Sequence, residues 1–127
     1  IPSSAASDVY KRQPLCGDAE VFKWIGAYFA GETPVMDKDG YAWMLHGDMG
    51  EDNTMAGVLM KEDAAPGQWI ESGPHLMRMP ADPSTLDGMT TDFASGAPYV
   101  MFAGTVYAHV MYPMVGYYDY QPESTPK

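Results

Sequence analysis

The stretch GAPYVMFAGTVYAHVMY, residues Gly96 to Tyr112, decides the fold of this chain. Two runs of β-branched and aromatic residues flank Ala103-Gly104, which predicts a tight β-hairpin at the centre of a sheet. The second run alternates between two faces, and its even-numbered face is the better candidate for plain core packing. Thr105, Tyr107, His109 and Met111 share one face, and Val106, Ala108, Val110 and Tyr112 share the other.

A second segment, Gly73 to Met79, reads GPHLMRM and begins in a similar way. Alternation along it places His75, Met77 and Met79 on one face of a strand. A proline precedes the apolar run in both segments, at the first position of a strand, where its missing N–H does no harm. Any chemistry predicted from the sequence depends on whether the faces of these two strands meet.

Local signals predict the other elements. Asp18 is suited to cap a helix and Gly31 to end it, and apolar residues between them recur at helical spacing, which predicts a helix over residues 18–30. Strands are expected over 41–45, 56–60 and 116–120, and another begins at 68–70 and leads into the His75 segment; a long irregular loop is expected over 80–98. The predicted fold class is α+β: one N-terminal amphipathic helix packed on a mostly antiparallel β-sheet or partial barrel. Residues 14–120 are expected to form a single globular domain and residues 121–127 a mobile tail.

The chain is acidic, with 17 Asp and Glu against 7 Lys and Arg, a net charge of −10. Such a surface repels phosphate backbones and anionic membrane surfaces, so nucleic-acid and membrane partners are not expected. It attracts cations, which favours a metal as a ligand. No apolar run reaches the roughly 18 residues of a membrane helix.

The first 13 residues, IPSSAASDVYKRQ, resemble translated sequencing-adapter sequence of the kind found at the ends of reading frames from metagenomic assemblies. We therefore expect residues 1–13 to be a non-native segment that replaces the natural N-terminus. Cys16 is the single cysteine of the chain. It is either a buried thiol that behaves as a small hydrophobe or a cysteine whose disulfide partner was lost with that N-terminus.

A metal site is the most specific chemistry that the residues offer. If the His75 strand meets the His109 strand, then His75, Met77, His109 and Met111 converge as a soft, neutral ligand set that suits copper, above all Cu(I). Tyr107 and Tyr99 would support these ligands with hydrogen bonds. The structural alternative is a half-buried face on which methionine fills the core and the histidines are hydrogen-bonded.

A second possible metal site lies in the loop 47–54, which is crowded with oxygen-bearing side chains. Asp48, Glu51, Asp52 and Asn53 could form a hard-cation site there. The alternative is a solvated loop with Asx turns.

Four segments carry a resemblance to known proteins: Cys16-Gly-Asp, Ala42-Trp-Met-Leu, Ser72-Gly-Pro-His-Leu-Met and the run from Gly96 to Met111. Together they resemble a set of small secreted or periplasmic bacterial proteins of uncharacterised function. Such proteins carry a signal peptide and further cysteines ahead of the position of Cys16. The resemblance therefore implies a periplasmic or extracellular location and a lost disulfide partner. Val106 stands where the resemblance would have proline.

The sequence therefore predicts an exported accessory protein with a His/Met metal site of copper type. One alternative is a non-catalytic interaction or assembly module that pairs with a protein partner or with itself through exposed aromatics or strands. Another is a small hydrolase with a spatially assembled site, for which His109, Asp92 and Ser95 are candidates. Motifs of serine hydrolases, phosphate loops, zinc proteases and CxxC redox proteins are missing from the sequence.

Overall fold

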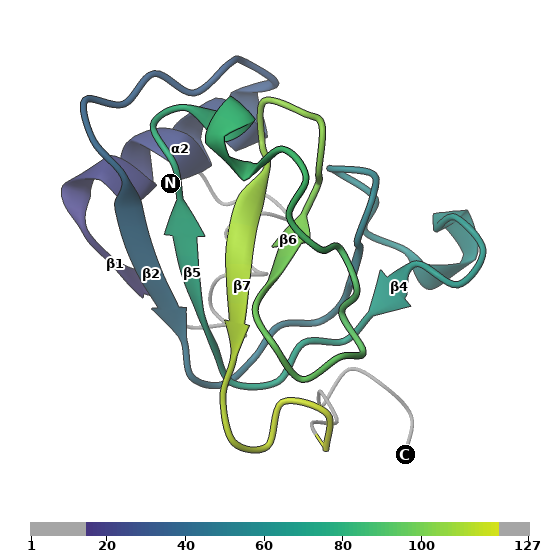
Figure 1. Ribbon diagram of the computed structural model, residues 1–127. Helices are drawn as coiled ribbons and strands as arrows, with labels where there is room; N and C mark the ends of the chain where they lie inside the picture. Colours follow the sequence, from purple (N-terminus) through teal and green to yellow (C-terminus); the bar gives the residue numbers. More distant parts are fainter. Residues whose placement is uncertain (1–14, 120–127) are drawn as a thin grey trace, which may run out of the picture.

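The computed structural model describes residues 15–119 and shows one helix packed on a five-stranded sheet (Figure 1). The strand order is β1-β2-β5-β7-β6, every pairing is antiparallel, and the sheet is open rather than closed into a barrel. The α+β prediction is therefore confirmed. The main sheet consists of β1 (Cys16–Gly17), β2 (Gly40–Met44), β5 (His75–Met79), β6 (Tyr99–Met101) and β7 (His109–Pro113), and α2 (Ala19–Ala30) is the helix.

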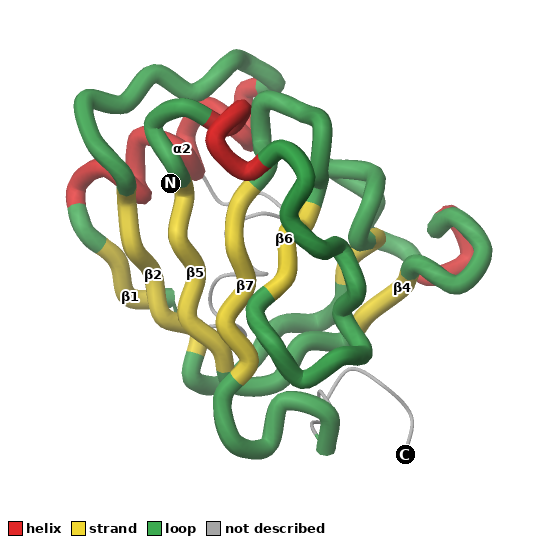
Figure 2. Tube along the Cα trace, in the orientation of Figure 1, coloured by secondary structure: helices red, strands yellow, loops and turns green. Residues whose placement is uncertain are grey.

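The remaining elements are short. They lie within the long connections between the main strands, and Figure 2 shows the loops of these connections in green. A second sheet, the β3–β4 ribbon, pairs β3 (Glu51–Asp52) with β4 (Trp69–Ile70). One 3-10 turn, η1 (Lys61–Asp63), lies between these two strands, and another, η2 (Pro83–Leu86), follows β5.

Helix α2 begins and ends where the sequence predicts. The Asp18 carboxylate accepts a hydrogen bond from Val21 N–H at 2.9 Å, and its other oxygen accepts one from Tyr41 N–H at 3.0 Å. The same side chain therefore caps the helix and fixes its start against β2. Gly31 ends the helix at a φ of 70°, in the left-handed region that glycine adopts without strain.

The main core lies between α2 and one face of the sheet. Alternation in β2 turns Ala42 and Met44 toward the helix, and β5 does the same with Met77 and Met79. Gly40 lets the helix approach closely, because a Cβ there would lie 2.7 Å from the backbone nitrogen of Val21. The helix contributes Val21, Trp24 and Ile25 to this core.

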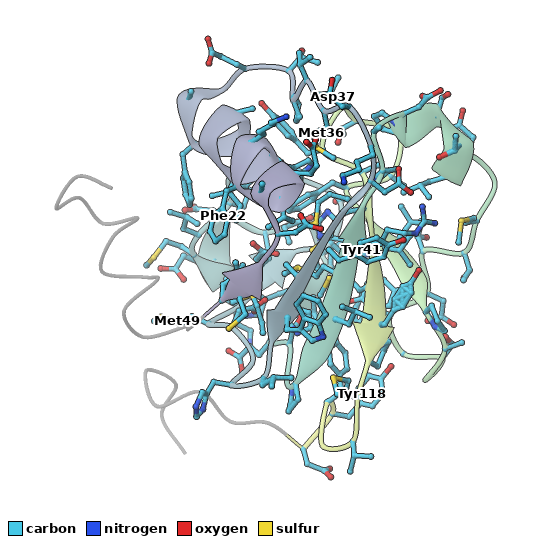
Figure 3. The ribbon with its side chains drawn as sticks, turned by 90° about the vertical axis from the view of Figure 1, so that its left-hand side faces the viewer. Phe22, Met36, Asp37, Tyr41, Met49 and Tyr118 are labelled. Carbon is cyan, nitrogen blue, oxygen red and sulfur yellow. The ribbon has the colours of Figure 1, made fainter. Side chains whose placement is uncertain are left out.

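The opposite face of the sheet is covered by η2 and the loop around it. A smaller core forms there from Val100, Ala108, Val110 and Leu86. Seen from the side, α2 and η2 lie on opposite sides of the sheet (Figure 3). The hairpin therefore buries both of its faces, and the irregular loop predicted over 80–98 contains only this one turn of 3-10 helix.

The hairpin pairs as predicted, with Tyr99 opposite Met111 and Met101 opposite His109, but its connection is wider. A turn does lie at Ala103-Gly104, closed by the hydrogen bond from Thr105 N–H to the Phe102 carbonyl at 3.2 Å, but a second turn follows it up to Ala108. The predicted two-residue hairpin connection is therefore wrong. The Thr105 hydroxyl donates to the Phe102 carbonyl at 2.7 Å and accepts from Tyr107 N–H at 3.1 Å. These local bonds replace the ladder that an extended strand would form.

Two predicted strands are absent from the described residues 15–119. Residues 56–60 turn away because the Asp52 carboxylate binds the N–H groups of Thr54 and Met55 and bends the chain directly after β3. Residues 116–119 form turns, with Gly116 at a φ of 88°. The predictions for residues 1–13 and for the tail 121–127 lie outside the described residues. Cys16 is exposed and free, so the buried-thiol interpretation is wrong.

Candidate functional site

A cavity of about 200 Å³ lies between α2 and the core face of the sheet. We call it the core cavity. Its walls are mainly aliphatic and aromatic, with a small acidic part and one imidazole. It is lined by Leu15, Trp24, Ile25, Tyr28, Phe29, Met44, Asp48, Glu51, Leu59, Met77, Met79, Phe102 and His109.

Two carboxyl groups form the acidic wall of the core cavity. Asp48 follows β2, is 7% exposed, and accepts a hydrogen bond from Gly50 N–H through Oδ1 at 3.1 Å. Burial raises the pKa of Asp48, and the nearby His75 only partly offsets this effect. Glu51, in β3, has a pKa well above its ordinary value because it is buried and lies near the Asp48 charge. Both carboxyls are therefore held in surroundings that favour their neutral forms.

His75 is fully buried behind Asp48. Its Nδ1 lies 2.6 Å from the Gly73 carbonyl oxygen, which only accepts, so Nδ1 carries the proton in this contact. Its Nε2 faces Asp48 Oδ2 at 3.9 Å, beyond hydrogen-bond distance. No partner for this Nε2 exists within residues 15–119. A buried acceptor without a donor is unusual and marks this end of the site.

Three hydroxyl groups next to His75 are joined by hydrogen bonds. The Tyr117 hydroxyl is hydrogen-bonded to the Ser72 hydroxyl at 3.0 Å and to the Tyr99 hydroxyl. The Tyr117 ring also packs edge-on against His75, with centroids 5.9 Å apart. Tyr99, which the sequence predicts to support the histidine ligands, makes its hydroxyl bond to Tyr117.

His109 lines the core cavity itself. Its Nδ1 lies 2.9 Å from the Tyr107 carbonyl oxygen, so Nε2 is the nitrogen with a free lone pair. The ring packs edge-on against Trp24 and Phe102, at 5.2 and 5.4 Å between centroids. Burial lowers the pKa of His109 to about 4, so the imidazole is neutral near pH 7. Tyr107 donates its hydroxyl to the Glu32 carbonyl at 2.9 Å and thereby ties this end of the site to the helix.

The predicted copper ligands share one face of the sheet but not one place along it. Met77 and Met111 are directly opposite each other, whereas His75 lies opposite Pro113. His109 is four residues from Pro113, which is about 13 Å along a strand. Of the predicted set, His109 and Met77 line the core cavity, and Met44 and Met79 join them there.

The structure divides the predicted hard-cation loop between two locations. Asp48 and Glu51 line the core cavity, whereas Asp52 binds its own loop: its carboxylate accepts from Thr54 N–H and from Ala65 N–H, both at 2.6 Å. Burial raises the pKa of Asp52, but these hydrogen bonds outweigh it and the net shift is downward.

Asn53, the fourth residue of that loop, donates from Nδ2 to the Thr91 carbonyl at 3.0 Å. Among residues 15–119, no group of three or more His, Cys, Asp or Glu side chains is placed to hold a metal ion. Two of the hydrolase candidates, Asp92 and Ser95, bind the backbone of their own loop. Asp92 accepts from Ala94 N–H and Ser95 accepts from Ala97 N–H, both in an exposed part of the 80–98 loop.

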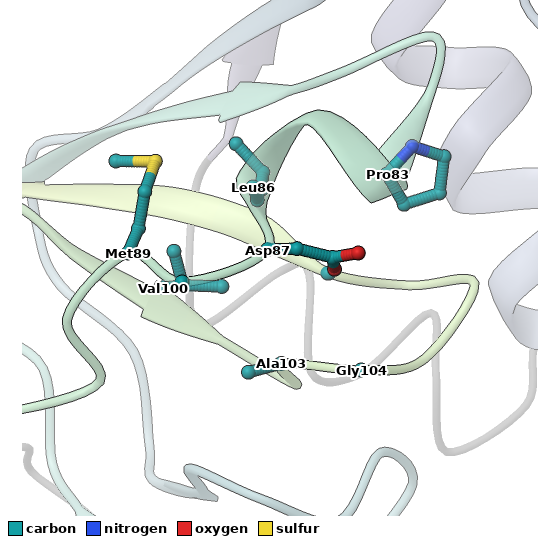
Figure 4. Close-up of a pocket in the computed structure, with 9 residues that line it drawn as sticks. Pro83, Leu86, Asp87, Met89, Val100, Ala103 and Gly104 are labelled. Atoms are coloured by element: carbon teal, nitrogen blue, oxygen red, sulfur yellow. The ribbon is translucent and has the colours of Figure 1, made fainter.

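A wider hollow of about 410 Å³ lies on the other face of the sheet, between η2 and the 102–108 loop (Figure 4). Pro83, Leu86 and Val100 form its walls, and Asp87 is the charged residue of its lining. Asp87 is exposed and stays hydrated. The core cavity, with buried polar groups that have perturbed pKa values, is therefore the stronger candidate for a binding site.

Sequence reasoning missed the helix as part of the site. Helical spacing predicts only core packing for Trp24 and Tyr28, and both also line the core cavity. Their size was the available signal, because bulky rings on a short helix leave gaps beside flexible methionines.

Comparison with known protein families, with curated proteins and with solved structures finds no match for this chain. Within the described part of the chain, no helix has the length and apolar character needed to cross a membrane.

Proposed function

We propose that this protein is a non-catalytic accessory protein that binds a small, largely apolar molecule in the core cavity. The observation that carries the proposal is a cavity of about 200 Å³ with aromatic and thioether walls and a few polar groups in its lining. This combination is typical of sites for small ligands. For comparison, an engineered cavity of about 150 Å³ binds benzene.

The position of the core cavity supports this proposal. It adjoins buried core residues such as Met77 and Met79, and it extends to Leu59, which is 61% exposed. A ligand therefore has a route from solvent to the aromatic wall. An empty cavity costs its lining residues packing contacts, and the fold would regain these contacts if the cavity collapsed. A ligand that fills the cavity supplies them instead. The export implied by the sequence resemblance is part of the same proposal.

Methyl resonances of methionine give a direct test. In protein labelled with ¹³C at the methionine methyl groups, benzyl alcohol should shift Met44, Met77 and Met79, which line the cavity. Met89 and Met114, which are exposed and lie outside it, should not move. Shifts of equal size at all methionines, or none at saturating probe, would contradict the proposal.

A matched pair of variants controls for surface binding. Leu59→Trp enlarges a side chain at the cavity rim and should weaken binding of the probe. Leu45→Trp makes the same change at a residue that is 58% exposed and does not line the cavity, and it should leave binding unchanged. Because both sites are exposed, neither substitution disturbs the core.

A second candidate function is Cu(I) binding in the same cavity, favoured by the presence of His109, Met44, Met77 and Met79 among its lining residues. Neutral imidazole and thioether are soft ligands that suit Cu(I). The double variant Met77→Leu, Met79→Leu keeps the side-chain volume and should lower the Cu(I) affinity about tenfold or more, since it removes two ligands. Affinity is measured anaerobically by competition with a chromophoric Cu(I) chelator.

Met111→Leu is the control, because Met111 is buried but does not line the cavity. Unchanged Cu(I) binding in the double variant would exclude the cavity ligands. A loss confined to Met111→Leu would favour the ligand set predicted from the sequence.

A further inference from the structure

The acidic end of the core cavity contains two carboxyl groups, and a buried imidazole nitrogen without a partner lies next to one of them. The Asp48 carboxyl accepts from Gly50 N–H at Oδ1 and also interacts with the backbone N–H of Ser72. The Glu51 carboxyl, which is half-buried, lies near Asp48 and accepts no hydrogen bond from the described residues. The buried Nε2 of His75 is without a partner, 3.9 Å from Asp48 Oδ2. The Nε2 lone pair of His109 faces the same cavity.

A buried acceptor without a donor, such as His75 Nε2, is costly. A neutral apolar molecule would offer the two carboxyl groups no donor, and an anion would add to the negative charge. A protonated amine is the small group that offers several N–H donors together with a positive charge. Aromatic walls suit the same group, because the faces of Trp24 and Tyr28 attract cations.

From this geometry we infer that the ligand of the core cavity is a small primary amine with an aromatic or aliphatic body, bound in its ammonium form by Asp48 and Glu51. The inference rests on the proposed function and adds the chemical class of the ligand. The body would lie between α2 and the methionines of β2 and β5, and the ammonium group would lie at the acidic wall.

Binding of an ammonium group should release a proton. In the free protein, the raised pKa values favour a neutral carboxyl at the acidic wall, and the cation favours its ionised form. The carboxyl proton then passes to the buffer, so affinity for the amine rises with pH. Several titratable groups from neighbouring elements interact with this pair: Tyr28 on α2, Glu71 after β4, His75 on β5, and Tyr99 and Tyr117.

The test compares benzylamine with benzyl alcohol, which has the same body and a neutral head group. By titration calorimetry at about pH 8, benzylamine should bind about tenfold more tightly or better, and this advantage should shrink toward about pH 5. Glu51→Gln should remove most of the advantage while benzyl alcohol binding stays within about twofold. Glu62→Gln, which changes the net charge equally at an exposed residue of η1, should preserve it.

The outcomes separate this inference from the function on which it rests. Equal binding of both probes would overturn the ammonium ligand and leave the small-molecule function standing. Failure of both probes to bind would overturn the function itself. An advantage lost equally in Glu51→Gln and Glu62→Gln would show attraction to the acidic surface alone and would also overturn the inference.

Discussion

The variant His109→Phe should be less stable than wild type at neutral pH and more stable than wild type at acidic pH. His109 is 2% exposed, and its ring lies against Trp24 and Phe102. Phenylalanine preserves the ring contacts but cannot bind a proton. The substitution therefore isolates the contribution of imidazole protonation to folding.

The magnitude follows from the pKa of His109, which burial lowers from 6.5 to about 4. Below pH 6.5 the unfolded chain binds a proton at this residue, but the folded chain does so only near pH 4. The contribution of neutral His109 to folding stability is therefore fully present above pH 6.5, and it is lost as pH falls from 6.5 toward 4. At about 1.4 kcal/mol per unit of pKa, the wild-type protein loses about 3 kcal/mol by pH 4 through this residue.

The variant avoids that loss but gives up the hydrogen bond from Nδ1 to the Tyr107 carbonyl, which contributes about 1 kcal/mol. His109→Phe should therefore be less stable than wild type by about 1 kcal/mol near pH 7 and more stable by about 2 kcal/mol near pH 4. The carboxyl groups titrate in both proteins, so their effect cancels in the difference.

Urea unfolding followed by tryptophan fluorescence at several pH values measures this difference. His46→Phe is the matched control, because it makes the same substitution at an exposed imidazole. A constant difference between His109→Phe and wild type from pH 7 to pH 4 would refute the reasoning. It would mean that His109 is protonated in the folded protein at an ordinary pH.

Three further predictions concern stability. Glu51→Gln should raise the urea midpoint relative to wild type, because the raised pKa of Glu51 makes its ionised form unfavourable in the folded protein. The difference in midpoint should grow as pH rises, and a difference that shrinks with rising pH would contradict this prediction. Gly40→Ala should destabilise by about 1–3 kcal/mol in thermal unfolding, since its Cβ would press on the Val21 backbone. Gly26→Ala, where a Cβ meets nothing within 4 Å, should instead stabilise the helix by about 0.5–1 kcal/mol. Asp18→Ala should cost about 1–2 kcal/mol by removing the N-cap and its bond to β2; no loss would show that the cap is dispensable.

The elements that could be predicted from the sequence are those fixed by their own residues. Asp18 and Gly31 set the ends of α2 locally, and alternation identified β5 and β7 because each buries a continuous face. The turn after β6 could not be predicted, because the hydroxyl of Thr105 competes with the strand ladder. Likewise, Asp52 bends the chain after β3 through bonds that no periodicity reveals.

In the candidate site too, local features could be predicted from the sequence and long-range positions could not. The shared face of His75, Met77 and His109 was predictable from alternation, and all three are buried. Their positions along the strands depend on the register between β5 and β7, which a single sequence does not contain. Asp48 and Glu51 share the core cavity with side chains of α2 and β5, which come from distant parts of the chain.

The β3–β4 ribbon has a kinetic consequence. Its strands pair over two residues each, whereas β5 is held by longer ladders on both sides. Glu51 and Leu59, which line the core cavity, belong to this ribbon and its connection, which project beyond β6 (Figure 1). Amide hydrogens of residues 53–68 should exchange by local opening, and those of β5 only by global unfolding. Variants that weaken α2 would then speed the exchange of β5, which depends on global stability, and leave the exchange of residues 53–68 unchanged.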